Sequence, residues 1–131
     1  MPHEHHLPLA VKAAVITVST TRTEKTDLSG KILCDAFHAA EMDVSEPVIV
    51  KDDEAEIRSA VENALLSANC IVVNGGTGLT HDDCTIEAVT PLFEKTMDGF
   101  GELFRMKSYE QVKNAVILSR ASAGIVKGRA V

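Results

Sequence analysis

Three apolar runs alternate along the chain with two segments of helical periodicity, and this order constrains the fold more than any other feature. The run 11–18 predicts a strand buried on both faces, and the run 70–73 predicts another buried strand. The run 44–50 predicts a strand in which Pro47 suits an edge or an irregular position. Apolar residues recur at helical spacing in the intervening segments, at Leu33, Ala36, Phe37 and Ala40 and then at Ile57, Val61, Ala64, Leu65 and Ala68.

The resulting β-α-β-α-β order predicts an α/β fold, with a three-layer, doubly wound, mostly parallel sheet and helices on both faces. Beyond it, residues 85–89 predict a short helix that Pro91 stops, and residues 100–107 predict a further helix. Ser108 and Gln111 have the spacing of a capping box, which indicates a helix start. The run 115–118 predicts a short strand, and 124–126 with 129–131 predict a hairpin.

The length of 131 residues suits one domain with its own core. We expect residues 1–10 to form a flexible tail and residues 11–131 to form the α/β domain. The tail contains His3, His5 and His6, which could bind a metal. A histidine-rich tail without a structured carboxylate or cysteine partner is more often only a tail, and we favour that interpretation.

Composition excludes several classes of partner. The net charge of −6 argues against a nucleic acid as the main partner, although a local glycine loop can still bind an anionic small molecule. No apolar run approaches the length of a membrane span, so no membrane partner is expected. The three cysteines, without a Cys-x-x-Cys spacing, indicate a reduced, cytoplasmic protein.

The run 70–73 leads directly into a glycine loop, Asn74-Gly75-Gly76-Thr77-Gly78. Glycines have no Cβ, so other atoms can approach this backbone closely, and successive N–H groups in such a loop form a concave anion site. The loop is neither a Walker A sequence nor the glycine pattern of dinucleotide-binding folds. It predicts a phosphate-binding pocket; a simple turn is the alternative.

Carboxylates follow two of the predicted strands. Asp52 and Asp53 come after the strand 44–50, and Asp82 and Asp83 come shortly after the glycine loop. Either pair could cap the helix that follows, and either could hold a divalent metal that bridges phosphate oxygens. In a parallel sheet Asp52, Asp83 and the loop share one edge, which predicts a common crevice. The polar residues 19–22 end the first strand at the same edge and could contact phosphate or merely be solvated.

These residues, taken together, resemble the molybdenum cofactor biosynthesis proteins of the MogA/MoaB type, a family that includes the gephyrin G domain. The resemblance covers almost everything after the tail. Its motifs occur in order at 14–19 with 21–23, 27–30, 51–53, 74–79, 83–87, 99–105 and 118–121.

The resemblance implies a molybdopterin-binding fold and, in active members, an adenylyltransferase that transfers AMP from Mg-ATP to molybdopterin and releases pyrophosphate. It implies that Asp83 is the principal catalytic carboxylate and Asp52 its partner, and that both bind Mg²⁺. It also implies a homo-oligomer, either a trimer or a hexamer. The ligand-binding residues that it implies are Ser19, Thr21, Ser29, Gly30, Gly75, Gly76, Thr77, Gly78, Ser119 and Arg120.

Other functions fit the same residues. A MoaB-type protein that binds pterin or nucleotide with little transferase activity is one alternative, and a non-catalytic scaffold domain is another. A generic phosphate-binding flavodoxin-like domain is a third. The chain also departs from the family's usual residues at Thr20, Lys51 and Ile86, and at Asp82, where arginine is usual. Relatives continue into a strand, a Pro-Gly-x-Pro loop and a helix, which we expect this chain to lack.

Overall fold

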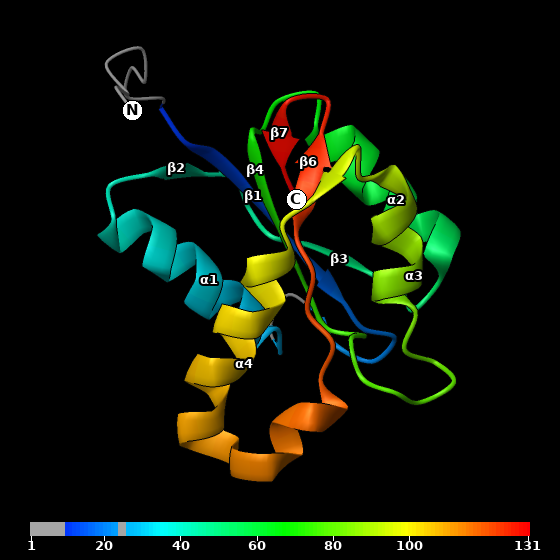
Figure 1. Ribbon diagram of the computed structural model, residues 1–131. Coiled ribbons are helices and arrows are strands. Elements are labelled where there is room, and N and C mark those ends of the chain that lie inside the picture. The colour runs from blue at the N-terminus through cyan, green and yellow to red at the C-terminus, as the bar shows by residue number, and fades with distance from the viewer. Residues whose placement is uncertain (1–9, 24–25) are drawn as a thin grey trace.

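A computed structural model of the protein describes residues 10–23 and 26–131 (Figure 1). The tail predicted at 1–10, with its three histidines, lies outside the described residues except for Ala10. Among the described residues, no helix is both long and apolar enough to cross a membrane.

The described residues form one seven-stranded sheet in the order β2-β1-β4-β7-β6-β5, with β3 also paired to β1. The strands are β1 (Lys12–Val18), β2 (Asp43–Val44), β3 (Val48–Val50), β4 (Cys70–Asn74), β5 (Lys95–Thr96), β6 (Gly124–Val126) and β7 (Arg129–Ala130). Strand β1 is parallel to β2, β3 and β4, and β4 is parallel to β7. Strand β6 is antiparallel to both β5 and β7. The sheet is therefore mostly parallel, as predicted, and it remains open.

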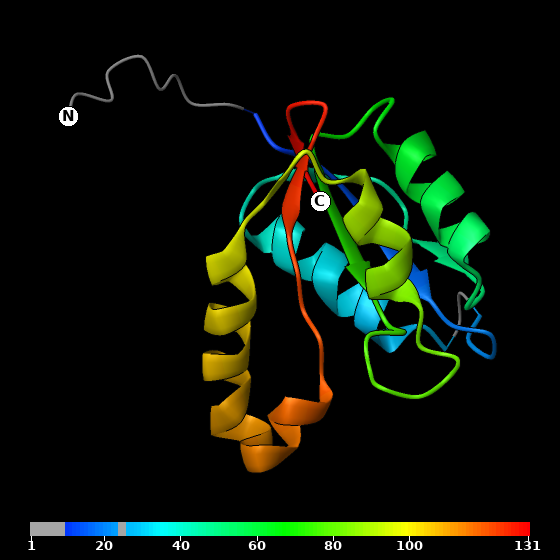
Figure 2. The same cartoon turned by 45° about the vertical axis from the view of Figure 1, so that its right-hand side comes forward.

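Helices cover both faces of this sheet (Figures 1 and 2). They are α1 (Leu28–Ala39), α2 (Glu54–Ala64), α3 (Thr85–Val89) and α4 (Asp98–Val112), with the 3-10 helices η1 (Thr90–Leu92) and η2 (Lys113–Leu118). Successive side chains of β1 point to opposite faces. Ile16 packs in one core with the fully buried Ile57 and Val61 of α2, whereas Thr17 contacts Asp27 at the start of α1. The predicted three-layer, doubly wound architecture is thus confirmed.

Two predicted segments differ in detail, and two predictions are wrong. The strand predicted at 44–50 is split into β2 and β3, with Pro47 between them, and both pieces pair with β1. The helix predicted at 100–107 extends to Val112. The separate helix start predicted at Ser108 is therefore wrong, because Ser108 lies inside α4. The run 115–118 is not a strand but belongs to η2, because its apolar residues Ile117 and Leu118 are exposed rather than paired in the sheet.

Candidate functional site

The glycine loop lies where β1, β3 and β4 end. It follows β4 directly, and its backbone favours glycine at two positions, because Gly75 has φ 93° and Gly76 has φ 65°. A Cβ on Gly75 would stand 2.3 Å from the carbonyl oxygen of Val18, the last residue of β1. The loop therefore passes against the end of the neighbouring strand, and a side chain at this point would force the two apart.

Asp52 comes from the end of β3 and lies beside the same loop. The hydroxyl of Thr20 donates a hydrogen bond of 2.7 Å to its Oδ2. Its Oδ1 is 3.2 Å from the point where a Cβ on Gly76 would stand. Asp53, the next residue, caps α2 by accepting hydrogen bonds from the N–H groups of Ala55 and Glu56. The sequence allowed either carboxylate to cap the helix or to face the predicted crevice. In the structure Asp53 caps the helix and Asp52 faces the glycine loop.

Asp83 lies at the other end of the loop. Its Oδ2 accepts hydrogen bonds from the N–H (3.0 Å) and the hydroxyl (2.8 Å) of Thr80, and a Cβ on Gly78 would stand 2.6 Å from it. These donors, together with the positive charge of Arg120, lower the pKa of Asp83 below its ordinary value. The carboxylate is therefore ionised at neutral pH, as a group that holds a cation must be.

The two carboxylates fit a cation that binds together with phosphate. Asp52 lies next to Gly76 and Asp83 next to Gly78, so the loop separates them. Within the part of the chain that the structure describes, no group of three or more His, Cys, Asp or Glu side chains could hold a metal by itself. Mg²⁺ commonly binds one or two carboxylates plus substrate phosphates, with water completing its shell. The donor set is suited to Mg²⁺ delivered with a nucleotide.

The polar residues after β1 form a cluster with the start of α1. The Oγ of Ser19 accepts hydrogen bonds from the N–H groups of Thr21 (3.3 Å) and Arg22 (3.1 Å). Arg22 in turn donates to the Oγ of Ser29 at 3.3 Å. Gly30 is buried, and a Cβ there would stand 2.1 Å from Asp27 Oδ2. Ser19, Thr21 and Ser29 thus lie together at the edge of the sheet, while Gly30 allows close packing beneath them.

Asp27 is a site residue that the sequence reasoning did not single out. The residue is 5% exposed, and its carboxylate accepts hydrogen bonds from the hydroxyl of Thr17 (2.8 Å) and the N–H of Gly30 (3.0 Å). Asn74, directly before the glycine loop, donates to the same Thr17 hydroxyl at 3.0 Å. A chain of hydrogen bonds therefore joins the end of β4 to the start of α1. The signal in the sequence was an aspartate three residues before Gly30, at the position of a helix N-cap.

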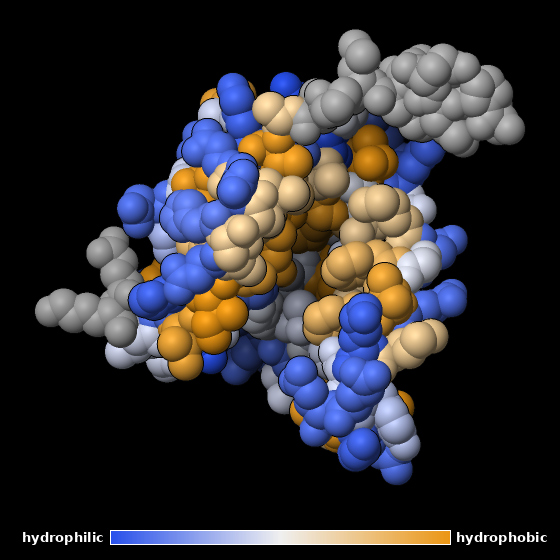
Figure 3. Space-filling model, turned by 90° about the vertical axis from the view of Figure 1, so that its left-hand side faces the viewer, coloured by the Kyte–Doolittle hydropathy of each residue, from blue (hydrophilic) through white to orange (hydrophobic). Residues whose placement is uncertain are grey.

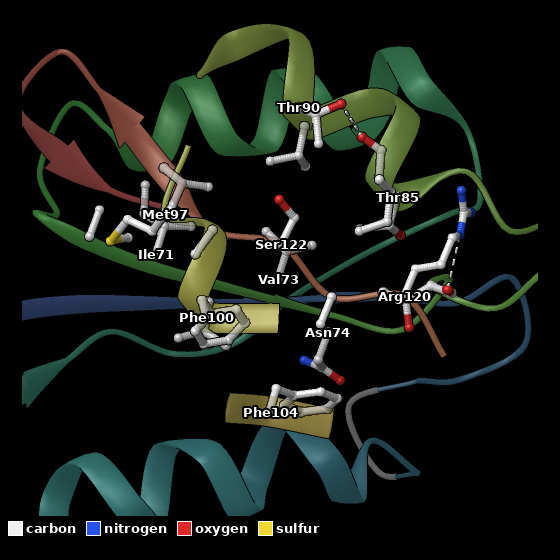
Figure 4. Close-up of a pocket in the computed structure, with 18 of the residues that line it drawn as sticks. Ile71, Val73, Asn74, Thr85, Thr90, Met97, Phe100, Phe104, Arg120 and Ser122 are labelled. Carbon is white, nitrogen blue, oxygen red and sulfur yellow. Dashed lines mark hydrogen bonds between the residues drawn. The ribbon is translucent and has the colours of Figure 1, made fainter. Parts of the chain in front are cut away.

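Arg120 reaches the glycine loop from the segment between η2 and β6 (Figure 4). Its Nε donates to the carbonyl oxygens of Thr77 (3.3 Å) and Gly78 (3.1 Å), and its Nη2 donates to that of Asp83 (3.3 Å). Both terminal nitrogens also pair with the carboxylate of Glu87 on α3. Ser119, its neighbour, is half-buried.

A cavity of about 400 Å³ adjoins the loop on the side of α4. Ile71 and Val73 of β4 lie on one side of it and Phe100 and Phe104 of α4 on another, with Arg120 at one end (Figure 4). Figure 3 shows that apolar side chains surround a hollow on the face that carries α1 and α4. The candidate site thus combines a polar, carboxylate-bearing loop with an apolar cavity next to it.

Comparison with known proteins identifies the family. Residues 14–129 match the model of the family described as "Probable molybdopterin binding domain". The molybdenum cofactor biosynthesis protein B of Bacillus subtilis is 42% identical over 132 residues, which cover 98% of this chain and 78% of the relative. The molybdopterin adenylyltransferase of Pyrococcus furiosus is 42% identical over 130 residues, which cover 97% of this chain and 76% of the relative.

Solved structures agree with this assignment. A crystal structure of a molybdenum cofactor biosynthesis protein B superimposes with a TM-score of 0.89 at 41% identity, and covers 96% of this chain and 80% of the other. The family match, the relatives and the fold all support one assignment: the chain belongs to the molybdopterin-binding family of molybdenum cofactor biosynthesis proteins.

Proposed function

We propose that this protein is a molybdopterin adenylyltransferase of molybdenum cofactor biosynthesis, with residues 11–131 as its molybdopterin-binding domain. In this reaction an oxygen of the terminal phosphate of molybdopterin attacks the α-phosphorus of Mg-ATP. A new P–O bond forms, the bond between the α-phosphorus and the bridging oxygen breaks, and pyrophosphate leaves. The observation that carries the proposal is the placement of two carboxylates beside one glycine loop, Asp52 next to Gly76 and Asp83 next to Gly78.

The residues divide the work according to their chemistry. Asp52 and Asp83 would hold Mg²⁺, which neutralises the charge that develops on the phosphates during transfer. The N–H groups of 75–78 would face phosphate oxygens, as oriented backbone dipoles do in other anion sites. The resemblance to the family implies a wider ligand-binding set, which we carry over as part of this proposal: Ser19, Thr21, Ser29, Gly30, Ser119 and Arg120.

The test compares two neighbouring carboxylates. We would measure pyrophosphate release from ATP, Mg²⁺ and molybdopterin for the wild type, Asp83→Asn and Asp82→Asn. Asp83→Asn should lower the rate by more than about 100-fold while molybdopterin still binds, because the developing phosphate charge loses its metal ligand. Asp82→Asn is the matched control, because Asp82 is exposed one residue away and should remain active. A wild-type protein that releases no pyrophosphate would refute the enzyme proposal.

A MoaB-type protein that binds pterin or nucleotide with little transferase activity is the second candidate. The exposed Asp82 favours it, because a carboxylate next to Asp83 adds negative charge where an anionic substrate would bind. A scaffold domain would bind without turnover in the same way. Pyrophosphate release separates the enzyme from these alternatives, because only the enzyme turns over, and calorimetric titration of ATP with and without Mg²⁺ tests whether the site binds a metal-nucleotide complex at all.

We also propose that the protein acts as a homo-oligomer, either a trimer or a hexamer, in the cytoplasm. Exposed apolar side chains on α1 and α4 support the oligomer, among them Leu28, Ile32, Leu103, Met106 and Val112. The three cysteines are free thiols, which supports a reducing compartment. Multi-angle light scattering checks the oligomer, since a mass equal to one chain would contradict it.

A further inference from the structure

We propose that Arg120 and Glu87 act as a pair that positions the glycine loop, and that Arg120 serves the site by fixing the loop's backbone rather than by contacting phosphate. This inference rests on the proposed function and specifies how one of its residues works. The inference also gives a role to Glu87, a residue that is not in the proposed ligand-binding set.

The guanidinium of Arg120 has few donors left for a ligand. An arginine side chain carries five N–H groups, one on Nε and two on each terminal nitrogen. Its Nε is shared between the carbonyl oxygens of Thr77 and Gly78, and Nη2 donates to Asp83 O (3.3 Å) and Glu87 Oε1 (3.1 Å). Nη1 pairs with the other oxygen of Glu87. One N–H on Nη1 lies outside these contacts, so the side chain is occupied mainly by the protein itself.

Together with Thr85, Arg120 holds the carbonyl groups of the four consecutive loop residues 75–78. The Oγ1 of Thr85 donates to Gly75 O (2.7 Å), and its N–H donates to Gly76 O (3.1 Å). Arg120 then holds Thr77 O through its own N–H (3.0 Å) and Nε, and holds Gly78 O through Nε (3.1 Å). Thr85 and Glu87 both belong to α3, so this one short helix supports both halves of the loop.

Fixed carbonyl groups determine where the N–H groups point. The N–H groups of Gly76 and Thr77 donate to no acceptor among the described residues. With the carbonyl oxygens directed toward α3 and Arg120, these N–H groups remain available to an anion without any rearrangement of the loop. Donors that are already oriented stabilise phosphate charge better than donors that must reorganise when it binds.

The direction in which one substitution changes the affinity for Mg-ATP distinguishes a positioning role of Arg120 from direct contact with phosphate. Glu87→Gln weakens the attachment of Arg120, so Mg-ATP should bind about tenfold more weakly if Arg120 holds the loop, the scale of one lost charge-assisted hydrogen bond. If Arg120 were instead a phosphate ligand, the same substitution would free its guanidinium and remove a negative charge, and Mg-ATP would bind more tightly. Asp35→Asn is the matched control, because Asp35 belongs to an exposed pair with Lys31 on α1.

A second variant keeps the positive charge at position 120 but not the planar arrangement of hydrogen-bond donors that arginine provides. Arg120→Lys retains a positive charge, yet one ammonium group cannot reach the Thr77, Gly78 and Asp83 carbonyls and Glu87 together. We expect Arg120→Lys to weaken Mg-ATP binding as much as Arg120→Ala does. Substantial rescue by lysine would overturn the proposal.

Hydrogen exchange of the unliganded protein tests the positioning role of Arg120 and Glu87 without any measurement of ATP binding. Thr85 N–H donates to the loop at Gly76 O, so its exchange reports whether the loop stays attached to α3. Glu87→Gln should accelerate this exchange at least several-fold, whereas amides in the centre of β4 should exchange as in the wild type. Unchanged Thr85 exchange would refute the positioning role. Faster exchange in a protein that binds no Mg-ATP would support the positioning role and refute the proposed function.

Discussion

The hydroxyl of Thr20 donates a 2.7 Å hydrogen bond to the carboxylate of Asp52, which joins the end of β1 to the end of β3. This contact orients Asp52 toward the glycine loop, because Asp52 Oδ2 is occupied while Oδ1 lies near Gly76. If Asp52 is the Mg²⁺ ligand that we propose, Thr20 is a group that orients it, and loss of such a group typically lowers metal affinity about 10- to 100-fold.

Thr20→Val should therefore raise the Mg²⁺ concentration needed for half-maximal ATP binding by about tenfold. Asp52→Asn should raise it further, because it removes the ligand. Calorimetric or fluorescence titrations of ATP over a range of Mg²⁺ concentrations would measure both effects. Thr96→Val, on the exposed strand β5, provides a control that loses a hydroxyl far from the loop. Equal Mg²⁺ dependence in Thr20→Val and the control would contradict a role for Thr20 in orienting Asp52.

Acid should remove the contribution of the Glu87–Arg120 pair to stability. The hydrogen bonds from Arg120 lower the pKa of Glu87, and those from Thr80 lower the pKa of Asp83. A carboxylate with a lowered pKa stabilises the fold above its unfolded-state pKa, and this contribution disappears as the pH falls through the lowered value. The unfolded-state pKa of Glu is about 4.3, so the contribution is complete at neutral pH and decreases below about pH 4.

Thermal unfolding of the wild type and Glu87→Gln between pH 3 and pH 8 tests this. The Tm of the wild type should exceed that of the variant by a constant amount above about pH 5, and the difference should narrow as the solution becomes more acidic. A difference that stays the same at pH 3 would show that Glu87 stabilises the fold without its charge.

Gly76→Ala should destabilise the protein by about 2 kcal/mol. Its φ of 65° is unfavourable for alanine, and the new Cβ would stand 2.5 Å from Thr85 Oγ1. That contact would displace the hydroxyl that holds Gly75 O. Urea denaturation would measure the change. Gly99→Ala is the matched control, because a Cβ there meets nothing within 4 Å and Gly99 lies in α4, where alanine is favoured. Unchanged stability of Gly76→Ala, or an equal loss in Gly99→Ala, would contradict this account.

Asp27→Ala should destabilise the protein by about 2–3 kcal/mol, because it removes the N-cap of α1 and leaves the buried Thr17 hydroxyl with one acceptor fewer. A double-mutant cycle with Thr17→Val separates the two contributions. We expect a coupling energy of about 1 kcal/mol between the two positions. Additive effects would indicate that Asp27 acts only as a helix cap.

The sequence predicted the central elements because their patterns are determined locally. The apolar runs at β1 and β4 fit strands that are covered on both faces, and the stripe of Ile57 and Val61 fits the buried face of helix α2. Parallel order then brought the residues after β3 and β4 to one edge, so the neighbourhood of Asp52 and the glycine loop followed from topology.

The remaining features depend on contacts between distant residues. Apolar composition alone could not distinguish a strand at 115–118 from the exposed 3-10 helix η2. Likewise, nothing near Arg120 in the sequence indicates that its side chain meets Glu87, 33 residues earlier. The partner of a long charged side chain is determined by tertiary packing, and residue type gives only a list of candidates.

The exposed carboxylate of Asp82 should limit the affinity for an anionic nucleotide. Replacing it with arginine changes the local charge by two units. Two unit charges about 8–10 Å apart in water interact by roughly 0.4–0.5 kcal/mol, and salt screens a large part of this. Because Mg-ATP carries about two net negative charges, the change of two units sums to roughly 1.6–2 kcal/mol without screening, and Asp82→Arg should tighten its binding about tenfold at low ionic strength. Calorimetric titration at several salt concentrations measures the effect.

Asp82→Asn changes the charge by one unit and should produce about half of that change in binding free energy. Both improvements should shrink as salt is added, because Asp82 is exposed and its field is screened within a Debye length of about 8 Å at physiological ionic strength. An improvement that is independent of salt would indicate a direct contact between the new side chain and the nucleotide. Weaker binding by Asp82→Arg would contradict the electrostatic argument and place the nucleotide away from this end of the loop.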